Sequence, residues 1–312
     1  MAGRAMEFHQ PDITPDDLIF LQYIGGTTGL SKGAMLSYGN LVSNIAGFEA
    51  WVGDVTRPGQ ELVVTALPLY HIFALMVNFL CYFKLGPHNV LIPNPRDLPS
   101  LVQEWKKWRV TAFTGVNTLY NGLLNTPGFD QCDFSGLTVS FGGGSATQRS
   151  VSDRWKQLTG LHISQGYGLS ETSPIVSSNL LNAPDFTGTV GIAFPSTDIR
   201  ILGEDGQGMG IGEPGEICVK GPQLMKGYWG VRPSGTRISH RTAIFAPATS
   251  PRWTKTAISA SSIARRTWFW SRGSTSFPMR WRMFWPAWTP CWRAPVSVCR
   301  TTRRARRSRC SA

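Results

Sequence analysis

The chain has 312 residues, and 42% of them are hydrophobic, which is enough to bury the core of one large domain or two ordinary ones. Its net charge of +12 is unevenly distributed. Residues 1–230 carry 14 Lys and Arg against 19 Asp and Glu, a net −5, whereas residues 231–312 carry 17 basic residues and no acidic one, a net +17. The chain therefore joins two different compositions.

The six cysteines form no C-x-x-C pair and have no zinc-binding spacing, which argues against a structural zinc site. Residues 1–7 do not resemble an apolar signal segment, and together with the cysteines they favour a reducing, cytoplasmic location. The most apolar stretch, residues 67–83, contains Pro68, His71 and Asn78 and is short for a membrane span. We expect a buried helix there.

Strands and helices alternate along the first part of the chain. In order, the patterns predict strands at 18–22 and 32–37, a helix at 41–51, a strand at 62–67, a helix after 68–73, a strand at 90–92, a helix at 98–108, and strands at 110–114 and 138–141. The strand at 138–141 leads through Gly142, Gly143 and Gly144 into a helix at 146–158, and a strand at 162–165 leads into a further glycine turn at 166–172. This alternation predicts an α/β fold with a parallel sheet.

From about residue 187 the pattern changes to short strands and turns, as in 199–202 and 213–221, which predicts a small β unit. We therefore divide the chain into a partial α/β domain at 1–186, a β-rich subdomain at 187–230 and a basic tail at 231–312. Ligands of parallel sheets bind beyond the carboxyl ends of the strands. We expect the three glycine-rich turns to converge on one crevice there.

The first of these turns is Tyr23–Gly33, with the sequence Y-I-G-G-T-T-G-L-S-K-G. Glycines permit a sharp turn and a close approach to a ligand, and successive backbone N–H groups with the hydroxyls of Thr27 and Thr28 can bind an anion. Lys32 adds a positive charge. The stretch predicts a phosphate-binding loop, with a flexible hairpin as the alternative. It is not a Walker loop, because Gly33 rather than Ser or Thr follows the lysine.

Four segments in this order, 23–33, 66–75, 166–172 and 212–229, together resemble bacterial long-chain fatty-acid–CoA ligases of the adenylate-forming, AMP-binding superfamily. The resemblance runs from about residue 8 to 230. Ile24 departs from it, since the family usually has Thr or Ser there, so one phosphate-facing hydroxyl is absent. That family uses Mg-ATP to convert a fatty acid to an acyl-adenylate and pyrophosphate, and then passes the acyl group to CoA.

The resemblance implies roles for individual residues. Those implied to be catalytic are Thr27, Lys32, His71 and Glu171. Those implied to bind ATP are Thr27, Thr28, Gly29 and Lys32 at the phosphates, Gly142, Gly143 and Gly144 on the adenine and acyl side, Gly166, Tyr167 and Gly168 around the adenine, and Thr172 at the phosphate oxygens. Glu171 would ligate Mg²⁺, which prefers carboxylate and phosphate oxygens. His71 would lie near the acyl carboxylate.

Each of these roles has a structural alternative. A histidine after a Leu-Pro-Leu-Tyr run is often a packing residue, Glu171 could be a surface carboxylate at a helix N-terminus, and Tyr167 could belong to the core. The resemblance also implies small-molecule partners (ATP, a long-chain fatty acid and CoA), with peripheral contact at the inner face of the membrane and no nucleic acid.

Residues 231–312 do not resemble the family. They contain sixteen Arg and seven Trp and no carboxylate, in place of the family's ribose-binding T-G-D, its hinge D-R-K-K-D and its adenylation lysine. We hypothesise that the tail is the same gene in another reading frame. If residues 263–268 are encoded ATC GCA AGA AGG ACA TGG after a G, the frame one nucleotide earlier encodes D-R-K-K-D-M. Residues 242–263 likewise permit D-G-Y-L-R-T-G-D-I-A-T-M-D-E-D-G-Y-L-R-I-V-D.

A slip between about residues 230 and 242 has physical consequences. An out-of-frame sequence has not been selected to bury a core, so we expect the tail to be disordered or poorly packed. Without the adenylation lysine, which must be positioned against the reacting groups, we expect this chain to be inactive or severely impaired. Because family-like sequence begins almost at once, we also expect Met1 to be an internal start, which makes the chain the middle of a ligase.

Two other functions remain open from the sequence. The +17 tail could bind nucleic acid, with a steep dependence on salt. The chain could also derive from an adenylating enzyme that acts on another carboxylic acid, such as an aryl or amino acid.

Overall fold

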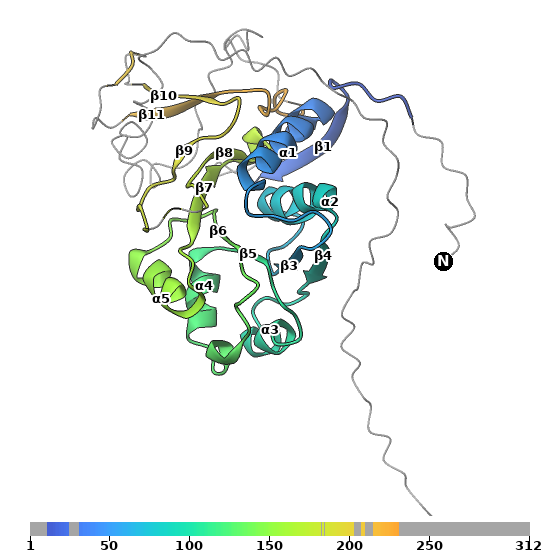
Figure 1. Cartoon of the computed structure of the whole chain (residues 1–312). Coiled ribbons are helices and arrows are strands. Elements are labelled where there is room, and N and C mark those ends of the chain that lie inside the picture. Colours follow the sequence, from blue (N-terminus) through green and yellow to red (C-terminus); the bar gives the residue numbers. More distant parts are fainter. Residues whose placement is uncertain are drawn as a thin grey trace, which may run out of the picture.

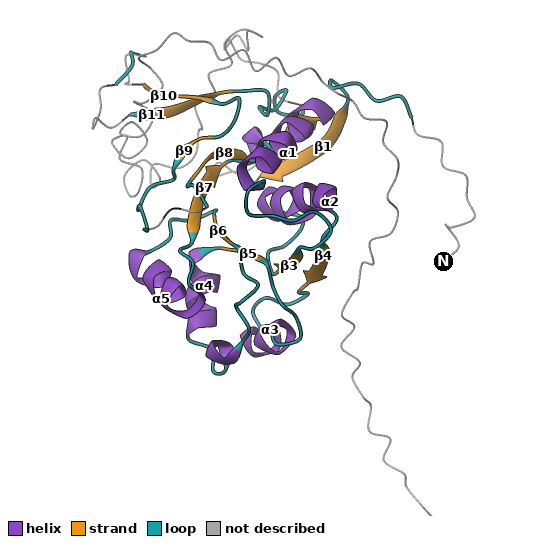
Figure 2. Ribbon diagram, in the orientation of Figure 1, coloured by secondary structure: helices purple, strands orange, loops and turns teal. Residues whose placement is uncertain are grey.

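The structure is a computed structural model that describes residues 11–24, 31–181, 183, 185–202, 207–209 and 215–230 (Figures 1 and 2). Thr27, Thr28 and Gly29 of the predicted phosphate-binding loop lie outside the described residues. The prediction that residues 231–312 lack native packing also lies outside them.

A seven-stranded sheet with the order β4-β3-β5-β6-β7-β8-β9 forms the centre of the fold. Its strands are β3 (Leu62–Thr65), β4 (His88–Leu91), β5 (Ala112–Gly115), β6 (Val139–Gly142), β7 (Ser164–Gly168), β8 (Ile175–Ser178) and β9 (Ile192–Ala193). The pairs from β4 to β7 are parallel, whereas β8 and β9 are antiparallel additions. The predicted α/β class is therefore confirmed, with a mixed, mostly parallel sheet.

Helices cover both faces of this sheet, because successive side chains of a strand point to opposite sides. Val63 and Ala112 pack with α1 (Tyr38–Val52), η2 (Ala74–Cys81) and α2 (Tyr82–Leu85). The adjacent residues Val64 and Phe113 pack with α3 (Leu98–Trp105), α4 (Asn117–Leu124) and α5 (Arg149–Thr159). Figure 1 shows these two helix groups on opposite sides of the sheet. Burial on both faces explains the continuous apolar run 62–64 of β3.

The apolar stretch 67–83 contains the predicted helix, of which η2 is a π-helix; its inner face is buried, whereas Phe79 and Phe83 are exposed. Asn78 fixes this helix to the sheet: its Nδ2 donates to the Thr65 hydroxyl at 3.0 Å, and the Thr114 hydroxyl donates to its Oδ1 at 2.7 Å. In the described part of the chain, no helix combines enough length and apolar character to cross a bilayer.

The first glycine-rich turn does not follow a strand of the parallel sheet, which corrects the expectation. It connects β1 (Leu18–Ile24) and β2 (Lys32–Ser37), which form a separate antiparallel pair in which Ile24 lies opposite Lys32. A parallel connection needs a crossover of a dozen or more residues, and the segment between these strands is too short for one. The hairpin reaches the core through Ala34 and Leu36, which pack in the same cluster as α1.

The predicted glycine turn at 166–172 is also partly wrong. Gly166 and Gly168 lie within β7, and the chain then reverses through the short 3₁₀ helix η4 (Ser170–Thr172) into the antiparallel strand β8. A Cβ atom at Gly168 would lie 2.0 Å from the carbonyl oxygen of Pro174, so only glycine lets the two strands approach this closely. Helix α4 and the 3₁₀ helix η3 (Phe129–Gln131) are further elements that the sequence patterns did not predict.

The predicted small β unit contains β10 (Asp198–Leu202) and β11 (Glu216–Lys220), which pair antiparallel in a sheet of their own. Strand β9, by contrast, pairs with β8 of the large sheet, and a domain boundary at 186/187 stays a prediction.

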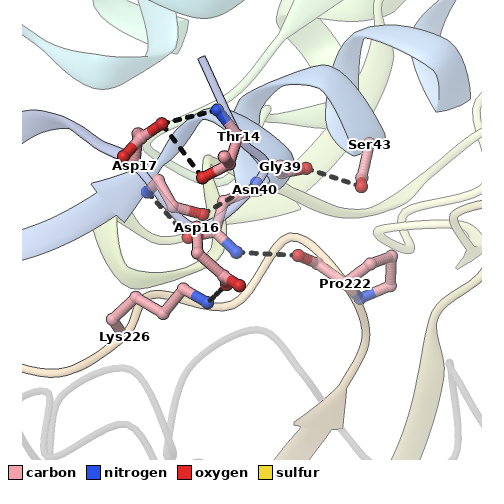
Figure 3. Close-up of polar contacts among 9 residues, drawn as sticks. Thr14, Asp16, Asp17, Gly39, Asn40, Ser43, Pro222 and Lys226 are labelled. Atoms are coloured by element: carbon pink, nitrogen blue, oxygen red, sulfur yellow. Dashed lines mark hydrogen bonds and ion pairs between the residues drawn. The ribbon is translucent and has the colours of Figure 1, made fainter. Parts of the chain in front are cut away.

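After β11, the chain returns to the start of α1, and Figure 3 shows the polar contacts that hold it there. Lys226 forms an ion pair with Asp16, and Nδ2 of Asn40 donates to the carbonyl of Pro222 at 2.8 Å. Asn40 also completes a capping box with Ser37 at the N-terminus of α1. The segment 221–230 therefore lies against the hairpin that carries the first glycine turn.

Candidate functional site

Lys32 lies at the base of the first glycine turn, where β2 begins. Its backbone pairs with Ile24 across the hairpin, and the hydroxyl of Ser31 donates to the Ile24 carbonyl at 3.1 Å. Both ends of the turn are therefore held together. The ammonium nitrogen of Lys32 lies 5.5 Å from the centre of the Tyr228 ring, within the range of a cation–π contact.

Glu171 lies in the turn η4 and its side chain is only 4% exposed. The hydroxyl of Tyr228 donates to Oε1 of Glu171 at 2.6 Å. The predicted phosphate-binding Lys32 and the predicted metal ligand Glu171 thus both contact the side chain of Tyr228. The three residues come from different parts of the chain: β2, η4 and the segment after β11. The interpretation of Glu171 as a surface carboxylate is not supported, because the side chain is buried.

The arrangement at Glu171 fits a magnesium ion bound with a nucleotide. In the described part of the chain, no three His, Cys, Asp or Glu side chains gather into a metal cluster. Mg²⁺ usually takes only one or two carboxylates and completes its shell with phosphate oxygens and water. The hydroxyl of Tyr228 takes one lone pair of Oε1 of Glu171, and an ionised carboxylate offers about four such acceptor sites in all.

Thr172 follows Glu171 in the same turn, but its hydroxyl serves the turn itself. The side chain is completely buried, and the hydroxyl bonds to the backbone of Leu169 and to the carbonyl of Pro174, the latter at 2.6 Å. These bonds close the reversal between β7 and β8. A contact of Thr172 with phosphate stays a prediction.

The second and third glycine-rich segments lie side by side at the carboxyl ends of β6 and β7. The register of these parallel strands places Gly142 opposite Gln165. A Cβ at Gly142 would lie 2.8 Å from Cγ2 of Ile163, and a Cβ at Gly143 would lie 3.2 Å from the Phe73 ring. Gly144 has a φ of +72°, which favours glycine. These two segments are therefore adjacent, whereas convergence of all three glycine-rich turns on one crevice stays a prediction.

Tyr167 lies next to Gly166 on β7, where its partly buried ring is available beside the glycine segments. Burial, with a smaller effect of the Glu171 charge, raises the pKa of Tyr167 to about 12. The phenol is therefore neutral at physiological pH. A neutral ring at this position is compatible with the predicted stacking on adenine, which stays a prediction.

His71 lies in the loop before η2, and its side chain is exposed at the surface of the described structure. Its Nδ1 accepts a hydrogen bond from the backbone N–H of Phe73 at 3.2 Å, which requires that nitrogen to be unprotonated. Partial burial lowers the pKa of His71. The packing-histidine alternative is weakened by the exposure, but no contact links His71 directly to Glu171 or Lys32 among the described residues.

Phe73 and Phe141 connect this loop to the glycine segments, and neither was among the predicted site residues. Their ring centres lie 6.0 Å apart, and Phe141 also lines an apolar cavity beside the sheet. Val77, Tyr82, Ile175 and Phe194 also line this cavity. Their positions in the sequence could have identified them: Phe73 lies within the segment 66–75, and Phe141 directly precedes Gly142. Tyr228 was likewise recognised as part of a motif but given no role.

Comparisons with known proteins agree with this geometry. The model of the AMP-binding enzyme family matches residues 3–229. Over 234 residues the chain is 50% identical to the long-chain-fatty-acid–CoA ligase of Escherichia coli O6:H1. This match covers 75% of this chain and 42% of that protein. It is 34% identical over 223 residues to the feruloyl-CoA synthase of an Amycolatopsis species, which covers 71% of this chain and 44% of that protein.

A similar fold is present in the crystal structure of ATP-bound MatB from Rhodopseudomonas palustris. The TM-score is 0.62 at 30% identity, and the match covers 76% of this chain and 44% of that one. The chain thus spans less than half the length of each of these three proteins.

Proposed function

The chain belongs to the AMP-binding enzyme family, and on that premise we propose that it carries the Mg-ATP-binding part of a long-chain fatty-acid–CoA ligase. In the proposed reaction a fatty-acid carboxylate attacks the α-phosphate of ATP, pyrophosphate leaves, and the acyl group then passes from AMP to the thiol of CoA. The observation that carries the proposal is the placement of Lys32 and Glu171 on the two sides of Tyr228. The 50% identity to a long-chain-fatty-acid–CoA ligase supports the choice of substrate.

Each predicted residue then has a physical task. Lys32, with Thr27, Thr28 and Gly29, would hold the ATP phosphates, and Glu171 would hold Mg²⁺. The bound ion neutralises negative charge on the phosphates and so eases the approach of an anionic carboxylate. The glycines of β6 and β7 would admit the nucleotide close to the backbone, with Tyr167 beside the adenine and His71 on the side of the acyl carboxylate.

We also propose that a change of reading frame separates the two compositions of the chain. The family model ends at residue 229, and no acidic residue follows Glu216 in the sequence. The alternative frame of residues 242–263 permits the family's T-G-D motif, and that of residues 263–268 permits its D-R-K-K-D hinge. In this proposal the 312-residue chain binds Mg-ATP but does not complete the ligase reaction.

The test is the gene together with its upstream DNA, with one nucleotide inserted between the codons of residues 230 and 242. We expect its product to catalyse exchange of pyrophosphate into ATP when a long-chain fatty acid is added, whereas the parent chain does not. A frame-restored Glu171→Gln protein is the matched control and should lose the exchange. The similarity to a feruloyl-CoA synthase motivates a second arm with aryl acids and amino acids. Exchange with those acids alone would replace the proposed substrate, and no exchange with any acid would contradict the proposed reaction.

We place the protein in the cytoplasm, with peripheral contact at the inner face of the membrane, because its proposed substrate partitions into lipid bilayers. Flotation with lipid vesicles that contain a free long-chain fatty acid tests this location. Protein that stays in the aqueous fraction at all vesicle compositions would contradict the membrane contact.

A further inference from the structure

Tyr228 lies between the two charged groups that are proposed to bind Mg-ATP. Its hydroxyl donates to Oε1 of Glu171 at 2.6 Å, while its ring centre lies 5.5 Å from Nζ of Lys32. The two charged residues are far apart in the sequence and lie on different elements. One side chain from a third element therefore contacts both of them.

The backbone around Tyr228 fixes the position of its ring. On the β2 side, the N–H of Met35 donates to the carbonyl of Gly227 at 2.9 Å, and the N–H of Trp229 donates to the carbonyl of Gly33 at 2.8 Å. On the η4 side, the N–H of Met225 donates to the carbonyl of Glu171 at 2.8 Å. The segment therefore connects the base of the first glycine turn to the turn that carries Glu171.

Glycine at position 227 is required for this arrangement. Gly227 has a φ of +142°, a conformation that L side chains rarely adopt. The backbone turns there so that residue 228 forms a bridge with Ala34 of β2. The backbone of Tyr228 is consequently held beside β2, within reach of both charged side chains.

A hydroxyl donor is useful to a buried carboxylate for two reasons. Glu171 is almost fully removed from water, so its charge needs a hydrogen-bond donor. The bond also restricts the orientation of the carboxylate, because Oε1 must face the phenol. Mutation of a group that orients a metal ligand in this way typically lowers metal affinity by about 10- to 100-fold.

We propose that Tyr228 is a positioning residue of the Mg-ATP site. Its hydroxyl orients the Glu171 carboxylate toward the ion, and its ring holds the Lys32 ammonium at the phosphates. This inference rests on the proposed function, since it takes Glu171 and Lys32 as the groups that bind Mg²⁺ and ATP.

The experiment measures ATP binding to the 312-residue chain by calorimetry, with and without Mg²⁺. Tyr228→Phe removes the hydroxyl but keeps the ring, so it should raise the Mg²⁺ concentration for half-maximal enhancement of ATP binding about tenfold, as loss of an outer-shell partner does. Metal-free ATP binding should stay unchanged. Tyr228→Leu also removes the ring and should in addition weaken metal-free binding. Tyr70→Phe is the matched control, because Tyr70 is 83% exposed.

The outcomes are separable. A Tyr228→Phe chain with the parental Mg²⁺ dependence, or with equal losses with and without Mg²⁺, would overturn the positioning role while leaving the proposed function in place. A parent chain that fails to bind ATP under either condition would instead contradict the proposed function, and this inference with it. A double-mutant cycle of Tyr228→Phe and Glu171→Gln in urea unfolding measures the contact without nucleotide; zero coupling would also contradict the inference.

Discussion

Phe141 occupies the space that a side chain at position 166 would need. A Cβ atom on Gly166 would lie 2.4 Å from Cζ of the Phe141 ring, which is itself buried against Phe73. The two residues belong to neighbouring parallel strands, β6 and β7. The glycine at position 166 therefore lets an aromatic ring of the core reach the edge of the candidate site.

Replacement of Gly166 by alanine should displace the Phe141 ring. We expect the Gly166→Ala chain to lose about 1–3 kcal/mol of unfolding free energy, the usual cost of overpacking, and to bind ATP more weakly. Urea unfolding and calorimetry measure the two effects. Gly208→Ala is the matched control, because a Cβ there would have no neighbour within 4 Å among the residues that the structure describes. Equal stability of the two variants would show that Phe141 yields without cost.

Loss of the Lys32 charge should weaken ATP binding without unfolding the hairpin. The backbone bonds between Lys32 and Ile24 do not depend on the side chain. We expect Lys32→Ala to raise the dissociation constant of ATP about tenfold or more, since hydrogen bonds to charged groups contribute about 1.5–3 kcal/mol. Lys220→Ala, an exposed position on β11, is the control. A Lys32→Ala chain with parental ATP affinity would remove Lys32 from the site.

Trp155 should be the most costly side chain to truncate in the second core cluster. It is completely buried, its ring packs on Phe113 and Tyr120, and its Nε1 donates to the Ser140 hydroxyl at 2.9 Å. We expect Trp155→Ala to cost about 3–5 kcal/mol of unfolding free energy, measured in urea. Trp229→Ala, at a side chain that is 58% exposed, should change it by about 0.5 kcal/mol or less. Similar effects at both positions would contradict the described core.

His162 should make the fold less stable in mild acid. Burial, and then the positive charge of Lys156, lower the pKa of His162, and its Nδ1 lies 3.2 Å from the Ser152 hydroxyl. The unfolded state, with an ordinary pKa of about 6.5, therefore binds more protons than the folded state in the window just below that pH. This contribution to stability is present above about pH 6.5 and is lost as the pH falls through that window to the folded-state pKa.

NMR titration of the His162 ring measures its pKa and so checks directly that folding lowers it. We expect a midpoint below that of an exposed histidine, and a shallower acid loss of urea stability in His162→Gln than in the parent chain. A midpoint above about 6.5 would contradict the lowered pKa.

Local sequence patterns predicted the elements in which the intrinsic preference of the residues matches the secondary structure they adopt. The strands β3, β5 and β6 are short and almost fully buried, because helices cover both faces of the sheet. Helix α4 was missed because Asn117, Asn121 and Gly122 are poor helix formers. Its stability comes instead from the burial of Leu119, Tyr120 and Leu123, which depends on neighbours that no local pattern contains.

In the candidate site, too, local patterns predicted some features, whereas others depend on contacts between distant residues. Glycine-rich motifs identified the segments around Gly142 and Gly166, and the parallel register places them together as expected. The antiparallel return of β8 was not predictable from spacing, because it depends on the contact of Gly168 with Pro174. The contact between Tyr228 and Glu171 joins residues 57 positions apart, and no local pattern carries it.

The central claim is that residues of β2, η4 and the segment after β11 form one Mg-ATP site. The most direct measurement is the dissociation constant of ATP for the 312-residue chain, with and without Mg²⁺, compared with that of Glu171→Gln. We predict saturable binding that Mg²⁺ strengthens in the parent chain, and binding that no longer responds to Mg²⁺ in Glu171→Gln. Absence of saturable ATP binding by the parent chain, or the same Mg²⁺ response in both proteins, would contradict the claim.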